Sequence, residues 1–83
     1  MRANKHPWLI GIGENIRQAR TAKGLSQEEL ANIAGVDRTY IGGIERGERN
    51  LAALNLIRIA LALEIEVGQL FPPIDSLDAD SSR

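Results

Sequence analysis

Three glycines divide the first fifty residues of this 83-residue chain into short segments. Gly24, Gly35 and Gly47 each end a stretch with helical spacing of apolar residues, as with Ile12 and Ile16 in the first. Glycine adopts the left-handed backbone that closes a helix without steric cost, so a periodic stretch that stops at glycine is typical of a capped helix. The spacing therefore predicts a series of short helices and an all-α fold.

Five short helices are expected around one core. Their predicted ranges are 9–23, 27–34, 37–46, 53–63 and a short turn at 67–71. Ser26 and Glu29 have the spacing of a capping box, in which each side chain bonds the other residue's backbone amide, and this fixes the start of the second helix. Asp37 is the expected N-cap of the third helix.

The composition limits what such a chain can do. It is long enough to bury one modest core, so we expect a single domain at residues 9–71. An arm at 1–8 precedes it, and an acidic tail at 72–83, flexible or ordered by a partner, follows it. Without cysteine there is no disulfide, thiolate metal site or cysteine nucleophile. No apolar run has the length of a signal peptide or membrane span, so a cytoplasmic protein without membrane contact is expected.

Charge is distributed unevenly along the chain. The total is −1, which argues against indiscriminate binding of nucleic acid, because such binding depends on neutralised phosphates. Residues 1–50 nevertheless carry eight Lys/Arg against six Asp/Glu, a net of +2, and residues 51–83 carry a net of −3. A basic surface is therefore expected only on the first part of the chain.

The third predicted helix contains two adjacent glycines, Gly42 and Gly43. Each costs about 1 kcal/mol of helix stability relative to alanine, a large fraction of the stability of a small domain. On a helical wheel the side opposite the core consists of Arg38, Thr39, Gly42, Gly43 and Arg46. Arg38 stands at the positive end of the helix dipole, where a cation is unfavourable unless it meets an anion. This side is therefore predicted to be a binding face whose glycines let a backbone or groove wall approach closely.

Two helices joined by a tight glycine turn, the second with a polar exposed face, form the pattern of a helix-turn-helix unit. The run "GENIRQARTAKGLSQEELANIAGVDRTYIGGIERGERNLAALNLIRIALAL" resembles the Cro/C1-type (Xre-like, lambda-repressor-like) helix-turn-helix domain, over about residues 9–71. Within that family, "GVDRTYIGGIERGERN" is most similar to the controller proteins of restriction–modification systems. The resemblance implies a small dimeric transcriptional regulator that binds palindromic operators in double-stranded DNA.

The resemblance also implies roles for individual residues. Base-reading positions are Gln27, Arg38 and Thr39, and positions near the DNA backbone or groove are Tyr40, Gly42, Gly43, Arg46 and Arg49. Arg20 and Glu45 match an ion pair that ties the first helix to the third. This sequence departs from the family where it lacks side chains at 42 and 43, and where Glu48 replaces a favourable cation. Recognition of the base sequence is therefore expected to depend more on Arg38 and Thr39.

The helix predicted at 53–63 has apolar residues on two sides. Leu54, Ile57 and Leu61 form a second stripe that so short a chain cannot easily cover. Exposed apolar stripes of this kind mark partner surfaces, so a homodimer is expected, with half-sites about one helical turn apart.

Other functions have weaker support in the sequence. The alternative to a regulator is an antitoxin-like protein-interaction module of the same fold. Glu28 and Glu29 are explained by helix capping, and His6 alone is not a metal site, so no enzyme, metal, cofactor or small-molecule substrate is expected. Trp8 and Leu9 have three possible roles, in packing under the first helix, in the dimer contact or as mobile residues; packing is favoured.

Overall fold

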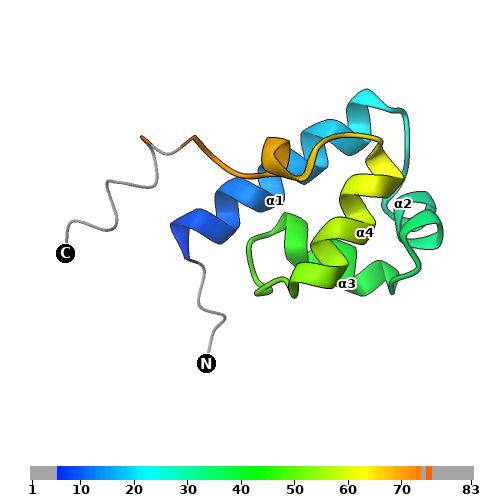
Figure 1. The fold of residues 1–83 in the computed structure, drawn as a ribbon. Helices are drawn as coiled ribbons and strands as arrows, with labels where there is room; N and C mark the ends of the chain where they lie inside the picture. Colours follow the sequence, from blue (N-terminus) through cyan, green and yellow to red (C-terminus); the bar gives the residue numbers. More distant parts are fainter. Residues whose placement is uncertain (1–5, 74, 76–83) are drawn as a thin grey trace.

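The computed structural model describes residues 6–73 and residue 75, and within them the chain is all-helical (Figure 1). Residues 6–73 form four α-helices, α1 (Pro7–Ala22), α2 (Gln27–Ala34), α3 (Arg38–Glu45) and α4 (Ala53–Leu63), followed by the 3₁₀ helix η1 (Val67–Leu70). The prediction of five helices is therefore corrected to four α-helices and one 3₁₀ turn. The last segment is too short for a ladder of α-helical bonds, and Pro72 and Pro73 after it prevent its continuation.

Most predicted boundaries are confirmed. The ranges of α2 and α4 are those predicted, and the Ser26–Glu29 capping box is present in full. In contrast, α1 begins at Pro7, so that Pro7 and Trp8 are helical although they were assigned to the arm. Proline is favoured at a first helical position because no amide bond is lost there, and the His6 Nδ1 atom accepts the Trp8 amide at 3.1 Å. Residues 1–5 of the predicted arm, and most of the predicted tail, lie outside the described residues.

The three glycine stops have the backbone that the sequence predicts. Gly24, Gly35 and Gly47 have φ values of +77°, +76° and +77°. One further residue of the described chain, Glu64, has positive φ and closes α4 in the left-handed conformation. The glycine turns let the chain reverse within a few residues, which packs α2 and α3 side by side (Figure 1).

Every helix contributes to one apolar core. The largest fully buried side chains are Ile16, Leu30, Ile41, Ile44, Ile59 and Leu70. Helix α1 packs on α3, α2 packs on α3 and α4, and η1 contacts α1 and α4. The side chain of Asn15 fastens η1 to α1 by donating to the Leu70 carbonyl at 3.1 Å. None of the described helices combines the length and the apolar character needed to cross a membrane.

Helix α1 meets the end of α3 through bare backbone. A Cβ atom at Gly13 would overlap the carbonyl oxygen of Ile44 and lie 2.9 Å from that of Glu45. Neighbouring backbone cannot move aside as a flexible side chain can, so only glycine fits at this crossing. The position of α3 relative to α1 therefore depends on Gly13.

Replacing Gly13 with alanine is expected to destabilise the protein by about 2–3 kcal/mol, because the methyl group forces α1 away from α3. Urea unfolding followed by circular dichroism measures the change. Gly68→Ala is the control, since a Cβ there has no heavy atom within 4 Å. If the two variants were equally stable, the backbone contact at Gly13 would not limit how closely α1 packs on α3.

Candidate nucleic-acid interface

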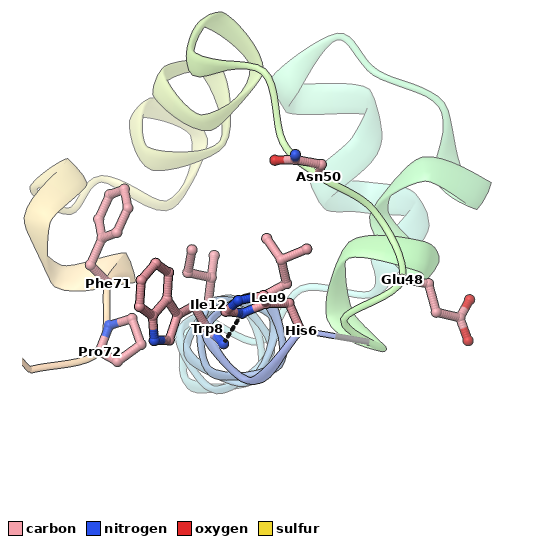
Figure 2. A pocket seen from close by; sticks show the side chains of 8 residues that line it. All are labelled: His6, Trp8, Leu9, Ile12, Glu48, Asn50, Phe71 and Pro72. Carbon is pink, nitrogen blue, oxygen red and sulfur yellow. Dashed lines mark hydrogen bonds between the residues drawn. The ribbon is translucent and has the colours of Figure 1, made fainter. Parts of the chain in front are cut away.

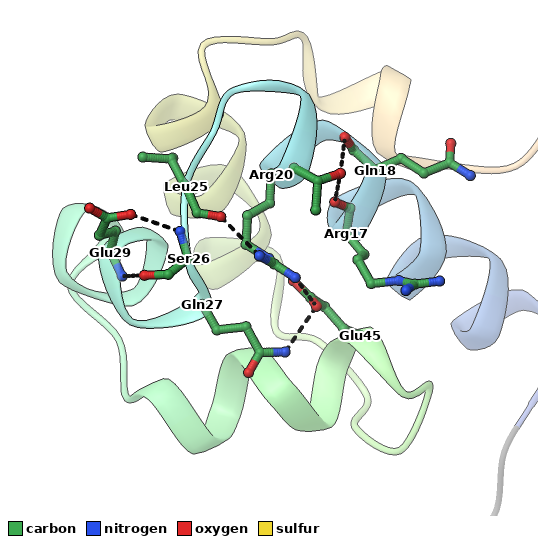
Figure 3. Close-up of polar contacts among 9 residues, drawn as sticks. Arg17, Gln18, Arg20, Leu25, Ser26, Gln27, Glu29 and Glu45 are labelled. Carbon is green, nitrogen blue, oxygen red and sulfur yellow. Dashed lines mark hydrogen bonds and ion pairs between the residues drawn. The ribbon is translucent and has the colours of Figure 1, made fainter.

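The buried carboxylate of Glu45 holds α1, α2 and α3 together (Figure 3). Arg20 donates to it twice, from Nε to Oε2 at 2.7 Å and from Nη2 to Oε1 at 3.0 Å. The Glu45 side chain is only 3% exposed, so this is a nearly buried ion pair. Hydrogen bonding to Glu45 raises the pKa of Arg20 above its usual value. The ion pair that the resemblance implied is thus present.

The side-chain amide of Gln27, at the start of α2, lies beside two neighbours. Its Nε2 atom donates to Glu45 Oε1 at 3.0 Å, which fixes the side chain against α3 (Figure 3). Its Oε1 atom lies 3.6 Å from the position a Cβ would take at Gly42. The predicted base-reading residue is therefore held by the ion pair, with its amide oxygen beside the exposed face of α3.

At the start of α3, Arg38 and Thr39 are both exposed. The Thr39 hydroxyl donates to Asp37 Oδ2 at 2.9 Å, and the Asp37 carboxylate makes no cap bond to the helix backbone. Asp37 is thus the N-cap by position, as predicted, without the side-chain bond expected of a cap. Arg38 takes part in no hydrogen bond or ion pair with another described residue. Its guanidinium remains available at the end of α3 where the helix dipole disfavours it.

Gly42 and Gly43 point away from the apolar core, as the wheel predicts, but their surface is not bare. Both are buried because arginine side chains lie over them. A Cβ at Gly42 would lie 3.1 Å from Arg46 Nη1, and one at Gly43 would lie 2.9 Å from Arg49 Cγ. The expectation of open backbone at this face is therefore wrong for the unbound chain, where the space of two missing side chains is filled by two arginines.

The arginines that cover the glycines are themselves held by neighbours. Arg46 Nε donates to Glu48 Oε1 at 3.0 Å, which gives Glu48 a role in holding Arg46 where a cation would favour phosphate binding. Arg49 lies over the ring of Tyr40, with Cζ 5.6 Å from the ring centre, an arrangement of the cation–π type. In the unbound protein, two arginine side chains therefore cover this face of α3.

Two residues on α4 join this surface although the sequence analysis missed them. Asn55 Nδ2 donates to the Tyr40 hydroxyl oxygen at 3.2 Å. Arg58 Nη1 donates to Asn55 Oδ1 at 3.4 Å. Asn55 and Arg58 interrupt an otherwise apolar helix with a spacing of three, which places them on one side of it. That interruption is the signal that would have identified them.

The predicted apolar stripe on α4 is exposed. Leu54, Ile57 and Leu61 have exposed fractions of 58%, 45% and 72%. No core residue of the described chain covers them, whereas Leu56 and Ile59 on the other side of α4 are buried.

An apolar cavity of about 630 Å³ lies apart from α3, between the start of α1, the loop after α3 and the segment after η1 (Figure 2). Trp8, Phe71 and Pro72 form one wall (Figure 2). Leu9 packs against the core as expected, whereas Trp8 keeps 36% of its surface exposed. No group of three or more potential metal ligands occurs among residues 6–73 and 75.

Comparison with known proteins gives the context of this geometry. The helix-turn-helix family model matches residues 16–70. Control protein C.SmaI of Serratia marcescens is 49% identical over 59 residues, which cover 71% of this chain and 70% of that protein. The crystal structure of the restriction–modification controller protein C.AhdI from Aeromonas hydrophila superposes with a TM-score of 0.75 at 52% identity, covering 76% of this chain and 96% of that one.

A third similar structure contains nucleic acid. The biofilm regulator SinR in complex with DNA is 38% identical, with a TM-score of 0.69, over 71% of this chain and 95% of that one. The region matched by the family model includes α2, the glycine turn and α3. The chain belongs to the Xre-type helix-turn-helix family of DNA-binding transcriptional regulators and is homologous to the controller proteins of restriction–modification systems.

Proposed function

We propose that the chain is a homodimeric controller of restriction–modification genes that recognises a palindromic operator through α3. The observation that carries this proposal is the exposed start of α3, where Arg38 has no partner among the described residues and Thr39 stands beside it. In helix-turn-helix proteins the second helix enters the major groove with its N-terminal residues against the bases. In α3 those residues are Arg38 and Thr39.

Arg38 is suited to guanine. A guanidinium donates two parallel hydrogen bonds to the O6 and N7 acceptors at the major-groove edge of guanine, and no other base presents that pair. Since Arg38 breaks no internal ion pair to do so, its binding energy is available for discrimination. Thr39 reaches a thymine methyl group or a phosphate, and the Oε1 atom of Gln27 is directed to the same side of α3.

Replacing Arg38 with alanine is expected to remove discrimination at one base pair of each half-site, equivalent to about 1–3 kcal/mol, with the fold unchanged. Selection of bound duplexes from a random pool, followed by titration of the selected and a scrambled duplex, measures the loss. Lys23→Ala is the control because it removes the same charge from a side chain paired with Glu64. An unaltered sequence preference for the Arg38 variant would exclude Arg38 as a base reader.

Gly42 and Gly43 differ in what an added methyl group displaces. Alanine at either position gains up to about 1 kcal/mol of helix propensity. At Gly42 it displaces only the far end of the Arg46 side chain, whereas at Gly43 it meets Arg49 Cγ, near the base of that side chain, and shifts the side chain from Tyr40. Gly42→Ala is therefore expected to raise the melting temperature, and Gly43→Ala to gain less stability and to lose DNA affinity. Tighter operator binding by both variants would show that neither glycine is needed for close approach.

Dimerisation fits the exposed stripe on α4. Three large apolar side chains on successive turns of one helix, none covered by the described chain, resemble the surface that a two-fold partner buries. Dimeric helix-turn-helix proteins read half-sites about one turn of DNA apart, and a two-fold contact through this stripe would suit such a palindromic operator.

Leu61→Lys is expected to convert the dimer to a monomer and to weaken operator binding, while the monomer stays folded. Light scattering after size exclusion measures the mass. The control is Ile33→Lys, because Ile33 is similarly apolar and 58% exposed but lies on α2. A dimer that persisted in the Leu61 variant, or was lost equally in the Ile33 variant, would mean that the subunits meet elsewhere.

A further inference from the structure

An open depression of about 410 Å³ lies where the turn before α3, the first turns of α3, and α4 meet. Its polar lining consists of Asp37, Thr39, Tyr40, Arg49, Asn55 and Arg58. Thr39 and Tyr40 also belong to α3, so the depression borders the proposed base-reading face directly.

Positive charge dominates this depression. Two arginines, Arg49 and Arg58, line it, against one acidic residue, Asp37. The Thr39 hydroxyl already donates to that carboxylate. Neither arginine forms an ion pair with another described residue, since Arg49 rests on the Tyr40 ring and Arg58 donates to a neutral amide. The depression therefore has a net positive charge and unused hydrogen-bond donors.

Asn55 sets the direction of the Tyr40 hydroxyl. Because Asn55 Nδ2 donates to the hydroxyl oxygen, the hydroxyl hydrogen is left to donate elsewhere. The other end of the same amide, Oδ1, accepts from Arg58 and holds that guanidinium at the rim. One side chain thus orients a neutral donor and a cationic donor toward the same space.

We propose that this depression is a cradle for a DNA backbone phosphate, in which Arg58 is a second cation beside Arg49, and Asn55 is a positioning residue that acts through Tyr40. A phosphate offers acceptor oxygens and negative charge, which matches a site made mainly of donors. The proposal rests on the proposed function in that α3 brings the DNA to the cradle. A free anion is a weaker occupant, because an open site is screened by salt, whereas a DNA phosphate is held there by the rest of the interface.

The salt dependence of DNA binding tests Arg58. Each phosphate contact contributes about 0.9 to the slope of log affinity against log salt, so Arg58→Gln is expected to lower the slope by about 2 for a dimer. The loss of DNA affinity in the variant, relative to the unsubstituted protein, therefore shrinks by roughly 12-fold between 50 and 200 mM salt. The loss is expected to be equal on a selected and a scrambled duplex. Lys23→Gln is the matched control, since it removes the same charge from a residue that does not line the cradle.

A double-mutant cycle tests the role of Asn55. If Asn55 acts through the Tyr40 hydroxyl, Asn55→Ala lowers affinity in the parent and lowers it less in the Tyr40→Phe background, where only its contact with Arg58 is left to lose. Asn55→Asp is expected to bind more weakly than Asn55→Ala, because a carboxylate draws the hydroxyl hydrogen inward and adds a negative charge. Melting temperatures of all variants separate loss of fold from loss of contact.

Three results would contradict the proposed phosphate cradle. One is a slope for Arg58→Gln equal to that of Lys23→Gln, and another is an altered base preference for Arg58→Gln. The third is stabilisation of the free protein by inorganic phosphate at constant ionic strength, present in the parent and lost in Arg58→Gln, which would assign the site to small anions. If the unsubstituted protein had no sequence preference, the proposed function would fail, but an Arg58-dependent slope on random duplexes would still support the cradle.

Discussion

The buried carboxylate of Glu45 is the interaction on which the arrangement of the other helices depends. It is the one charged or polar residue in the buried part of the described chain, and two side chains from other helices satisfy it. A buried charge that loses a partner costs about 3–5 kcal/mol, so neither α1 nor α2 can shift without a large penalty. Arg20 also donates to the Leu25 carbonyl at 2.9 Å, which fixes the turn between these helices. The orientation of α3 is therefore set at its C-terminal end.

Anchoring α3 at that end leaves its other end for the proposed contact with DNA. At the Glu45 end, α3 is fixed by the ion pair and by backbone contact with Gly13. At the Arg38 end, the Thr39 hydroxyl bonds Asp37, and the described chain offers no partner for the arginine. A fixed helix with an unpaired tip can place a guanidinium on a base edge without first losing an internal bond, which is the condition for discrimination.

Local signals predicted much of this structure, and contacts between distant residues account for what was missed. The capping box and the glycine turn predicted the limits of α2, and the run of apolar residues predicted those of α4, because these signals depend on neighbours in sequence. The Arg20–Glu45 pair, 25 residues apart, came only from the family resemblance. The sequence sets Asn55 apart from the apolar residues of α4, but it does not indicate that Asn55 reaches Tyr40 or that Arg49 lies over Gly43. Both contacts depend on how α4 and the loop after α3 pack.

The glycine pair now has a different explanation from the one its sequence suggests. Gly42 and Gly43 leave space that the unbound protein fills with Arg46 and Arg49, held by Glu48 and Tyr40. These arginine side chains are already ordered against the helix backbone, so less side-chain entropy would be lost if they bound DNA phosphates. Their bonds to Glu48 and Tyr40 must be exchanged, however, which limits the net gain on any sequence. Under the proposed function, this exchange limits the affinity for the DNA backbone, and the unpaired Arg38 then contributes a larger share of the difference between operator and other DNA.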